Sequence, residues 1–149
     1  MGWVEEQFER RMQSSERTRG DQAELEKRFE VLAEQRWSEL VGGLQEDVDE
    51  YQRLGGDADL RSISETEYRI SNNVSGAAAK IVVDLTAHTI QYIFESEKQD
   101  VAVPEGGFFS IRRSGRGAEF YSADQRITPE QARRMILEPV LFPNPPRIM

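Results

Sequence analysis

The stretch DQAELEKRFEVLAEQRWSELVGGLQEDVDEYQRL, residues 21–54, decides the fold of this chain. Its apolar residues recur at steps of mostly three and four, which places them on one face of a helix. They are Leu25, Phe29, Leu32, Trp37, Leu40, Val41, Leu44, Val48, Tyr51 and Leu54. The spacing predicts one long amphipathic helix from Asp21 to Leu54, with Trp37 in the core between that helix and the rest of the chain.

Residues that satisfy free backbone groups mark both ends of this helix. Asp21 is a predicted N-cap, and Glu24 three residues later completes a capping box. At the other end, Gly55 and Gly56 permit the left-handed conformations that terminate helices.

A glycine pair interrupts the middle of the predicted helix. Gly42 and Gly43 each cost about 1 kcal/mol relative to alanine. The pair therefore indicates a kink, a break or the close approach of another element, and close packing is the preferred interpretation.

A second apolar stripe precedes the long helix. Val4, Phe8 and Met12 lie four residues apart with Trp3 beside them, which predicts a helix over residues 2–17. The polar residues 14–20 either turn the chain into a helical hairpin or form a polar gap in a single rod. The capping box at Asp21 favours the hairpin. Trp3 and Phe8 are interpreted as core residues, with an exposed docking patch as the alternative.

The apolar period changes from 3.6 to 2 after residue 64, following a short polar connection over residues 57–64. Alternation predicts strands at Tyr68–Val74, ending or bulging near Asn72-Asn73, at Lys80–Leu85 and at His88–Glu95, with a loop of small residues over 75–79. The runs FFSIRR (108–113) and AEFYS (118–122) add a hairpin. One side of each strand is polar, so the sequence predicts a five-stranded antiparallel meander covered on one face.

A second helix start follows the predicted sheet. Thr128 is a predicted N-cap, Pro129 fits the first helical position, and Gln131 completes a capping box. Pro139 is expected to stop the helix, and a Pro-rich tail follows. The apolar residues expected against the body are Ala132, Met135 and Ile136, with Leu141 and Phe142 from the tail.

Together these patterns predict an α+β fold: an N-terminal helical hairpin with one long amphipathic helix, an antiparallel sheet and a C-terminal helix. We expect one domain over residues 1–149. Residues 1–56 form an acidic helical arm, residues 57–127 the sheet, and residues 128–149 the C-terminal helix and tail.

Charge and composition narrow the possible partners. The net charge is −8, and residues 1–60 carry 16 acidic and 8 basic side chains, whereas residues 61–149 carry 11 of each. An acidic arm repels phosphate backbones, so the charge disfavours nucleic-acid binding. The chain has no cysteine, no signal-peptide layout and no apolar run near 18 residues. We therefore expect a cytoplasmic protein that does not enter membranes.

His88, the only histidine, follows Asp84 by four residues across a predicted tight turn. Such a pair could act as a general base, yet no motif marks a nucleophile, and the alternation places His88 on the buried face. A hydrogen-bonded structural histidine is the favoured interpretation. The sequence predicts no catalytic residues, no metal ligands and no cofactor, because no ligand spacing or phosphate-binding glycine motif is present.

The hairpin RRSGRG places Arg112, Arg113 and Arg116 close together beside glycines whose N-H groups could help to hold an anion. A solvated loop, or a partner for acidic side chains, is the alternative. His88 and Tyr92 are candidate residues of a pocket between sheet and helices.

The predicted long helix is too long for the sheet to cover. Its 34 residues extend about 50 Å, whereas a strand of eight residues extends about 26 Å. We therefore predict a homodimer formed through the helices, and a protein-interaction or scaffold module without enzyme activity that also offers a surface to a protein partner. A helix kinked at Gly42-Gly43 around one sheet is the rival. A small-ligand or anion-binding protein, which could be an enzyme, is the alternative function. The candidate self-association residues are Val4, Phe8, Leu25, Phe29 and Leu32.

Overall fold

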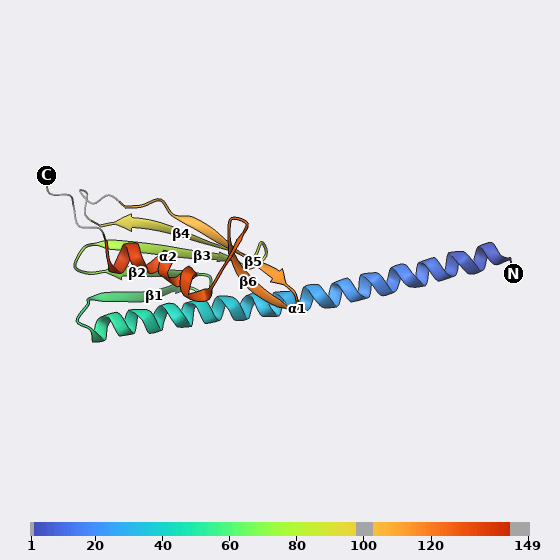
Figure 1. Ribbon diagram of the computed structural model, residues 1–149, viewed down its shortest axis with the longest axis horizontal. Helices are drawn as coiled ribbons and strands as arrows, with labels where there is room; N and C mark the ends of the chain where they lie inside the picture. The colour runs from blue at the N-terminus through green and yellow to red at the C-terminus, as the bar shows by residue number, and fades with distance from the viewer. Residues whose placement is uncertain (1, 98–102, 144–149) are drawn as a thin grey trace.

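A computed structural model describes residues 2–97 and 103–143 of the chain. It consists of a long N-terminal helix, an antiparallel sheet and a C-terminal helix (Figure 1). The α+β class predicted from the sequence is confirmed. Neither described helix contains an apolar stretch long enough to cross a bilayer.

The N-terminal helix α1 is continuous from Trp3 to Arg53. The predicted helical hairpin is therefore wrong. Residues 14–20 stay helical, and Thr18 Oγ1 donates to the Ser14 carbonyl at 3.0 Å, a bond that fits the helix. Asp21 lies inside the helix rather than at a cap, because the preceding residues already supply helical carbonyls to the N-H groups of the next turn.

The C-terminal end of α1 lies where the glycines predict it. The Gly55 N-H donates to the Gln52 carbonyl at 3.1 Å, and the Gly56 N-H donates to the Tyr51 carbonyl at 2.9 Å. This pair of bonds is a Schellman motif, and Gly55 supplies its positive φ of 102°. The motif separates the helix from the sheet that follows.

The sheet has seven strands in the order β1-β2-β3-β4-β5-β6-β7, all paired antiparallel. The predicted number of five is wrong, because β1 was assigned to a polar connection and β7 has only three residues. The strands are β1 (Ala58–Ser64), β2 (Glu67–Asn72), β3 (Ala77–Asp84), β4 (Thr89–Ser96), β5 (Gly107–Ser114), β6 (Gly117–Ser122) and β7 (Gln125–Ile127).

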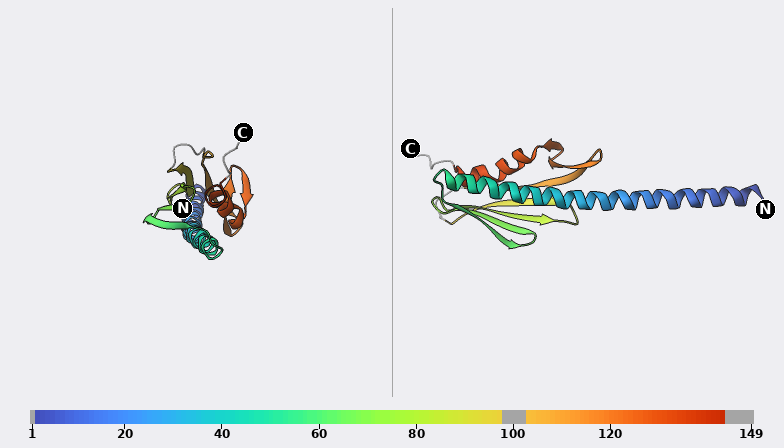
Figure 2. Two further views of the ribbon diagram at one scale, coloured as in Figure 1. Left: turned by 90° about the vertical axis from the view of Figure 1, so that its left-hand side faces the viewer. Right: turned by 90° about the horizontal axis from the view of Figure 1, so that it is seen from below.

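Both helices pack against the same face of this sheet. Helix α1 contacts β1, β5 and β6, whereas α2 contacts β2, β3 and β4. An end-on view shows the strands in an arc around α2, with α1 at the open side (Figure 2, left). On β4, Ile90, Tyr92 and Phe94 are buried while Gln91 and Ile93 are exposed. The opposite face carries ion pairs such as Lys80 to Glu67 at 2.9 Å.

The C-terminal helix α2 runs from Pro129 to Leu141. Its capping box is confirmed, with the Gln131 N-H donating to Thr128 Oγ1 at 3.1 Å and the Thr128 N-H donating to Gln131 Oε1 at 2.8 Å. Pro139 does not stop the helix, because it lies in the last turn, where burial of Val140 and Leu141 holds the chain.

Two further expectations for the C-terminal segment do not hold. Met135 is exposed, and Phe142 is 70% exposed although its ring meets Tyr51 of α1 edge-on at 5.6 Å, so neither is buried against the body as expected. The remaining tail, residues 144–149, lies outside the described residues.

The long helix passes through Gly42-Gly43 without a break (Figure 1). A Cβ atom at Gly42 would meet nothing within 4 Å, whereas one at Gly43 would lie 2.6 Å from Arg133 Cδ on α2. Arg133 Nε in turn donates to Asp47 Oδ2 at 2.9 Å. Close packing, the preferred interpretation of the pair, therefore applies to Gly43.

The two glycines give a matched pair of substitutions. We expect Gly42→Ala to raise the free energy of unfolding by about 0.5–1 kcal/mol, because alanine restricts the unfolded chain and favours helix. Gly43→Ala should gain less or destabilise, since the methyl group displaces Arg133 from Asp47. Urea unfolding followed by circular dichroism measures both. Equal gains at the two positions would show that Arg133 does not limit Gly43.

Candidate functional site: the projecting helix

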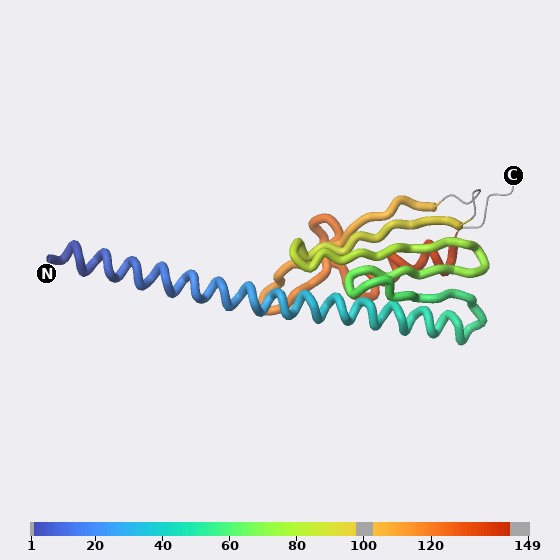
Figure 3. Tube along the Cα trace, turned by 180° about the vertical axis from the view of Figure 1, so that it is seen from behind, coloured from blue at the N-terminus to red at the C-terminus, as the bar shows by residue number. Residues whose placement is uncertain are grey.

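Residues 3–32 of α1 project from the body as a single helix, and only the last turns of this segment reach the tips of the hairpins (Figures 1 and 3). The sheet and α2 cover only the second half, where Ala33, Trp37, Leu40, Leu44 and Val48 are buried. At about 1.5 Å per residue the whole helix extends about 76 Å, so the projecting part, named the arm here, accounts for more than half of it. Every residue of the arm from 3 to 28 is exposed, and Phe29 and Leu32 at its base are half-buried.

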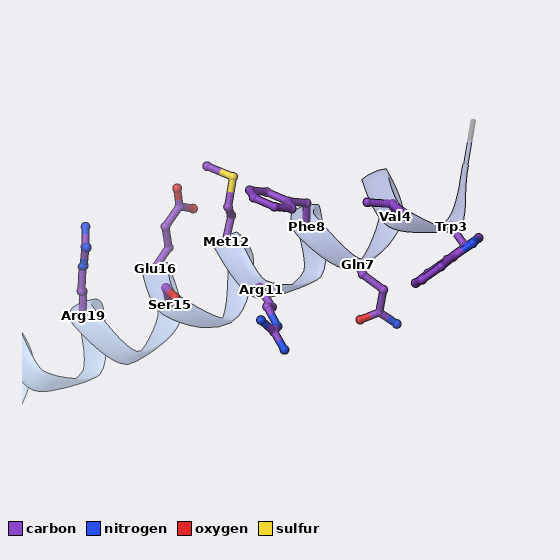
Figure 4. Close-up of a pocket in the computed structure, with 9 residues that line it drawn as sticks. All are labelled: Trp3, Val4, Gln7, Phe8, Arg11, Met12, Ser15, Glu16 and Arg19. Atoms are coloured by element: carbon purple, nitrogen blue, oxygen red, sulfur yellow. The ribbon is translucent and has the colours of Figure 1, made fainter.

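Large apolar side chains are exposed at the end of the arm. Trp3 is 75% exposed and Phe8 69%, and Val4 and Met12 are also mostly exposed. Figure 4 shows these side chains on one isolated helix, with Val4, Phe8 and Met12 on one side and Trp3 on the other. The surface that they line, together with Arg11 and Ser15, is open, because no second element stands opposite.

A regular spacing runs along the arm. The 3,4 stripe consists of Val4, Phe8, Arg11, Ser15, Thr18, Gln22, Leu25, Phe29 and Leu32. Its steps alternate strictly between three and four, the spacing of a coiled-coil seam. Only Arg11 is charged among these nine positions, whereas 13 of the other 20 positions from 4 to 32 are charged. The stripe is therefore set apart from the rest of the helix surface by charge as well as by apolar character.

The excess acidity does not lie on the arm. Residues 3–32 carry eight acidic and six basic side chains, whereas residues 33–60 carry eight acidic and only two basic ones. Most of the acidic excess assigned to the N-terminal helical part therefore lies on residues 33–60, next to the sheet. The projecting part is close to neutral, so charge repulsion hardly opposes the association of two arms.

The base of the arm rests on the tips of the β3-β4 and β5-β6 hairpins. Phe29 packs edge-on against His88 at a centroid distance of 4.7 Å, and the Arg113 guanidinium lies over the Phe29 ring at 5.8 Å. Arg36 Nε donates to the Ala118 carbonyl at 2.7 Å. These contacts fix the direction in which the arm leaves the body.

A groove of 340 Å³ lies beside this junction, between α1 and the β5-β6 hairpin. Its apolar wall consists of Leu25, Phe29 and Leu32, the last three members of the 3,4 stripe. Its basic residues are Arg28 from α1 and Arg113 and Arg116 from the hairpin. One end of the stripe therefore lies in a cationic groove.

The structure separates the three arginines of the predicted anion site. Arg113 and Arg116 line the groove, whereas Arg112 points to the other side of β5. Arg112 lies over the Tyr121 ring at 5.2 Å and pairs with Asp124 at 3.3 Å. Arg28 takes its place beside the other two, and no local pattern reveals this, because the contact joins segments far apart in the sequence.

Asp84 and His88 make different contacts in the β3-β4 turn. Asp84 Oδ1 accepts from the Thr86 N-H at 2.9 Å and from the Ala87 N-H at 3.0 Å, so this carboxylate caps the β3-β4 turn. His88 has a positive φ of 54° in the same turn and packs on Phe29. The geometry supports a structural role for both residues.

Tyr92 is part of the core between sheet and helices. Its ring stacks on Phe109 at 4.9 Å and meets Phe94 edge-on at 5.7 Å. Burial raises the pKa of the Tyr92 phenol above its ordinary value of 10.0. Tyr92 belongs to the buried core in the middle of β4, whereas His88 lies in the turn that precedes this strand.

Two further features bear on ligand chemistry. A groove of 610 Å³ runs along the outer side of α1 and α2, between Tyr51, Leu54, Leu137 and Phe142. Among residues 2–97 and 103–143, no three His, Cys, Asp or Glu side chains gather closely enough to hold a metal ion.

Comparison with known proteins finds no matching family model, no matching curated protein and no matching solved structure.

Proposed function

We propose that this chain is a protein-interaction module without enzyme activity that self-associates through the arm. The observation that carries this proposal is the 3,4 stripe on a projecting helix, with Val4, Phe8 and Leu25 exposed and Phe29 and Leu32 half-buried at its base. The candidate self-association residues taken from the sequence, Val4, Phe8, Leu25, Phe29 and Leu32, all belong to this stripe.

The physical case rests on exposed apolar surface and on helix stability. Soluble monomers rarely expose large apolar side chains in a continuous patch, and such patches mark interaction sites. In addition, most helices in proteins are stabilised by packing rather than by intrinsic propensity. Gly20, in the middle of the arm, weakens it by about 1 kcal/mol relative to alanine. Packing against another helix would supply the missing stabilisation.

A second copy of the chain is the occupant that best fits the stripe. Apolar residues are at both ends of the stripe, and four polar residues are between them, of which only Arg11 is charged. Because the same pattern is present on every copy, two arms can bury their apolar ends against each other. Closed two-fold assemblies of this kind are the commonest oligomers.

The proposed dimer leaves the body free to meet a different protein. The polar sheet face and the groove between α1 and α2 both lie on the body, away from the arm. The arm would then join two bodies, as in a scaffold. The alternative of a small-ligand protein receives less support, because core side chains occupy the space between sheet and helices.

Sedimentation equilibrium tests the self-association. We expect a mass of twice 17.1 kDa for the unmodified chain at micromolar concentration. The double variant Val4→Glu/Phe8→Glu should sediment as a monomer. The substitutions remove the apolar contacts of both side chains, and pairing of the arms would then bury two carboxylates on each arm.

A matched control places the same two charges elsewhere on the arm. Gln13→Glu/Ala23→Glu adds both carboxylates outside the 3,4 stripe and should leave the dimer intact. Circular dichroism checks that the helix content of both variants is retained. A mass near 17.1 kDa for the unmodified chain, unchanged on concentration, would refute the proposal.

A further inference from the structure

The stripe distinguishes between the two possible orientations of paired arms. In a parallel pair each residue meets its own copy, so Arg11 would face Arg11 in the middle of the seam. In an antiparallel pair aligned about the middle of the arm, Val4 faces Phe29 of the second copy and Phe8 faces its Leu25. Apolar residues then meet apolar residues at both ends of the seam.

The middle of the seam agrees with the same alignment. Arg11 faces Gln22 of the second copy, and Ser15 faces its Thr18, so polar residues meet uncharged polar residues. The antiparallel pair therefore avoids the repulsion between two arginines, which costs stability when like charges are brought into contact. A single register of the two arms therefore pairs both the apolar ends and the polar middle of the stripe.

This alignment carries the tip of one arm into the groove at the base of the other. Val4 of the second copy comes to Phe29, whose ring lines the groove. Glu5 and Glu6 next to it bring two carboxylates to a site that holds Arg28, Arg113 and Arg116. The groove thus presents an apolar wall for Val4 and basic side chains for the acidic residues beside it.

We propose that the arms pair antiparallel and that the N-terminal turn of each arm, residues 3–6, occupies the groove between α1 and the β5-β6 hairpin of the other copy. This inference rests on the proposed function, since it specifies how the arms associate. Two-fold symmetry fills both grooves in the same way.

A peptide turn suits the groove better than a free anion does. Leu25, Phe29 and Leu32 form a wall that an inorganic anion leaves in contact with water, whereas Val4 covers it. The arginines alone would bind either the carboxylates of a peptide turn or a free anion. The combination of apolar wall and basic side chains matches the combination of Val4 with Glu5 and Glu6.

Cysteine cross-linking determines the orientation, because the natural chain has no cysteine. In the antiparallel pair, position 11 of one copy lies opposite position 22 of the other. Two positions 11 are then separated by about 16 Å along the axis at 1.5 Å per residue, too far for a disulfide, whose Cα atoms lie about 4.4–6.8 Å apart. We expect neither single variant, Arg11→Cys or Gln22→Cys, to form a disulfide-linked dimer by itself. A mixture of the two variants should form one after re-annealing.

The other outcomes separate the orientation from the association itself. Disulfide-linked dimers of each variant alone would show a parallel pair, which overturns the antiparallel proposal and leaves self-association standing. No disulfide in any sample, together with a monomeric mass by sedimentation, would overturn both. No disulfide with a dimeric mass would place the contact on another surface and also overturn both proposals, since each requires the arms to pair.

Charge reversal tests the groove. Glu5→Arg/Glu6→Arg and Arg113→Glu/Arg116→Glu should each raise the dimer dissociation constant about fivefold to tenfold, as expected for a few exposed ion pairs. Combining all four changes restores the pairs and leaves the net charge unchanged, so the affinity should return. Arg112→Glu is the matched control, because Arg112 lies outside the groove and its reversal should change the dissociation constant by less than about twofold.

Inorganic phosphate serves as the probe for a free anion. In the monomeric Val4→Glu/Phe8→Glu variant the groove is empty of a second copy, and we expect phosphate to leave its Tm unchanged. A phosphate-dependent rise in Tm that disappears with Arg113→Glu/Arg116→Glu would assign the groove to a free anion and overturn the proposed occupant. Failure of the four-residue combination to restore affinity would overturn it as well.

Discussion

Replacing Trp37 by alanine is expected to lower the free energy of unfolding by about 3–5 kcal/mol. Trp37 is only 6% exposed and lies in the core between α1 and the sheet, with its ring edge-on to Tyr68 of β2 at 5.7 Å. Truncation to alanine removes these contacts and leaves a cavity that the strands and α2 cannot fill without moving. Urea unfolding at a fixed protein concentration measures the change, followed by circular dichroism because the substitution also removes one of the two tryptophans.

Val31→Ala is the matched control on the same helix. Val31 is 56% exposed and does not belong to the 3,4 stripe, so its truncation should change the free energy of unfolding by no more than about 0.5 kcal/mol. An unfolding midpoint that Trp37→Ala leaves unchanged would contradict the placement of Trp37 in the core. Equal losses at Trp37 and Val31 would indicate a general sensitivity of the helix instead.

The burial of Trp37 could be predicted because helical periodicity extends over many turns. The same periodicity could not decide whether residues 14–20 turn or continue. Asp21 and Glu24 form a sequence pattern that caps a helix only when the preceding chain leaves it, and here that chain stays helical. Local capping chemistry is worth about 1 kcal/mol, so it does not by itself break a helix that its neighbours continue.

The two missed strands show a different limit of sequence patterns. Strand β1 is buried at Ala58 and half-buried at Leu60, whereas its last four residues are exposed, so its sequence shows no sustained alternation. It forms because its backbone pairs with β2, from Ala58 opposite Asn72 onward. Strand β7 adds three residues to the edge of β6 in the same way. Edge strands held mainly by backbone hydrogen bonds carry little side-chain signal.

The sequence could predict the helical part of the candidate site but not the groove beside it. Val4, Phe8, Leu25 and Phe29 carry a period that can be read along one helix. The meeting of Arg28 with Arg113 and Arg116 depends on where the β5-β6 hairpin reaches α1, which no local pattern encodes. The separation of Arg112 from Arg113 follows from strand alternation, because successive side chains point to opposite faces.

Replacing Asn72 by alanine should lower the free energy of unfolding by about 2–4 kcal/mol. Asn72 is only 4% exposed, and its side chain joins the end of β2 to the end of α2. Its Nδ2 donates to the Val140 carbonyl at 2.9 Å, and its Oδ1 accepts from the Val74 and Ser75 N-H groups at 2.9 and 3.1 Å. Alanine removes all three bonds and leaves the buried Val140 carbonyl without this donor, which costs more than the bond alone is worth.

The adjacent Asn73 supplies the control for this prediction. Its Nδ2 donates to Asp57 Oδ1 at 2.8 Å and to Asp59 Oδ2 at 2.9 Å, but the side chain is exposed. Water can replace both bonds, so Asn73→Ala should cost about 1 kcal/mol or less. Urea unfolding of the two variants under one set of conditions compares them directly. If Asn73→Ala cost as much as Asn72→Ala, the burial of the Asn72 amide would not be what ties α2 to the sheet, and the turn that both residues enter would be responsible instead.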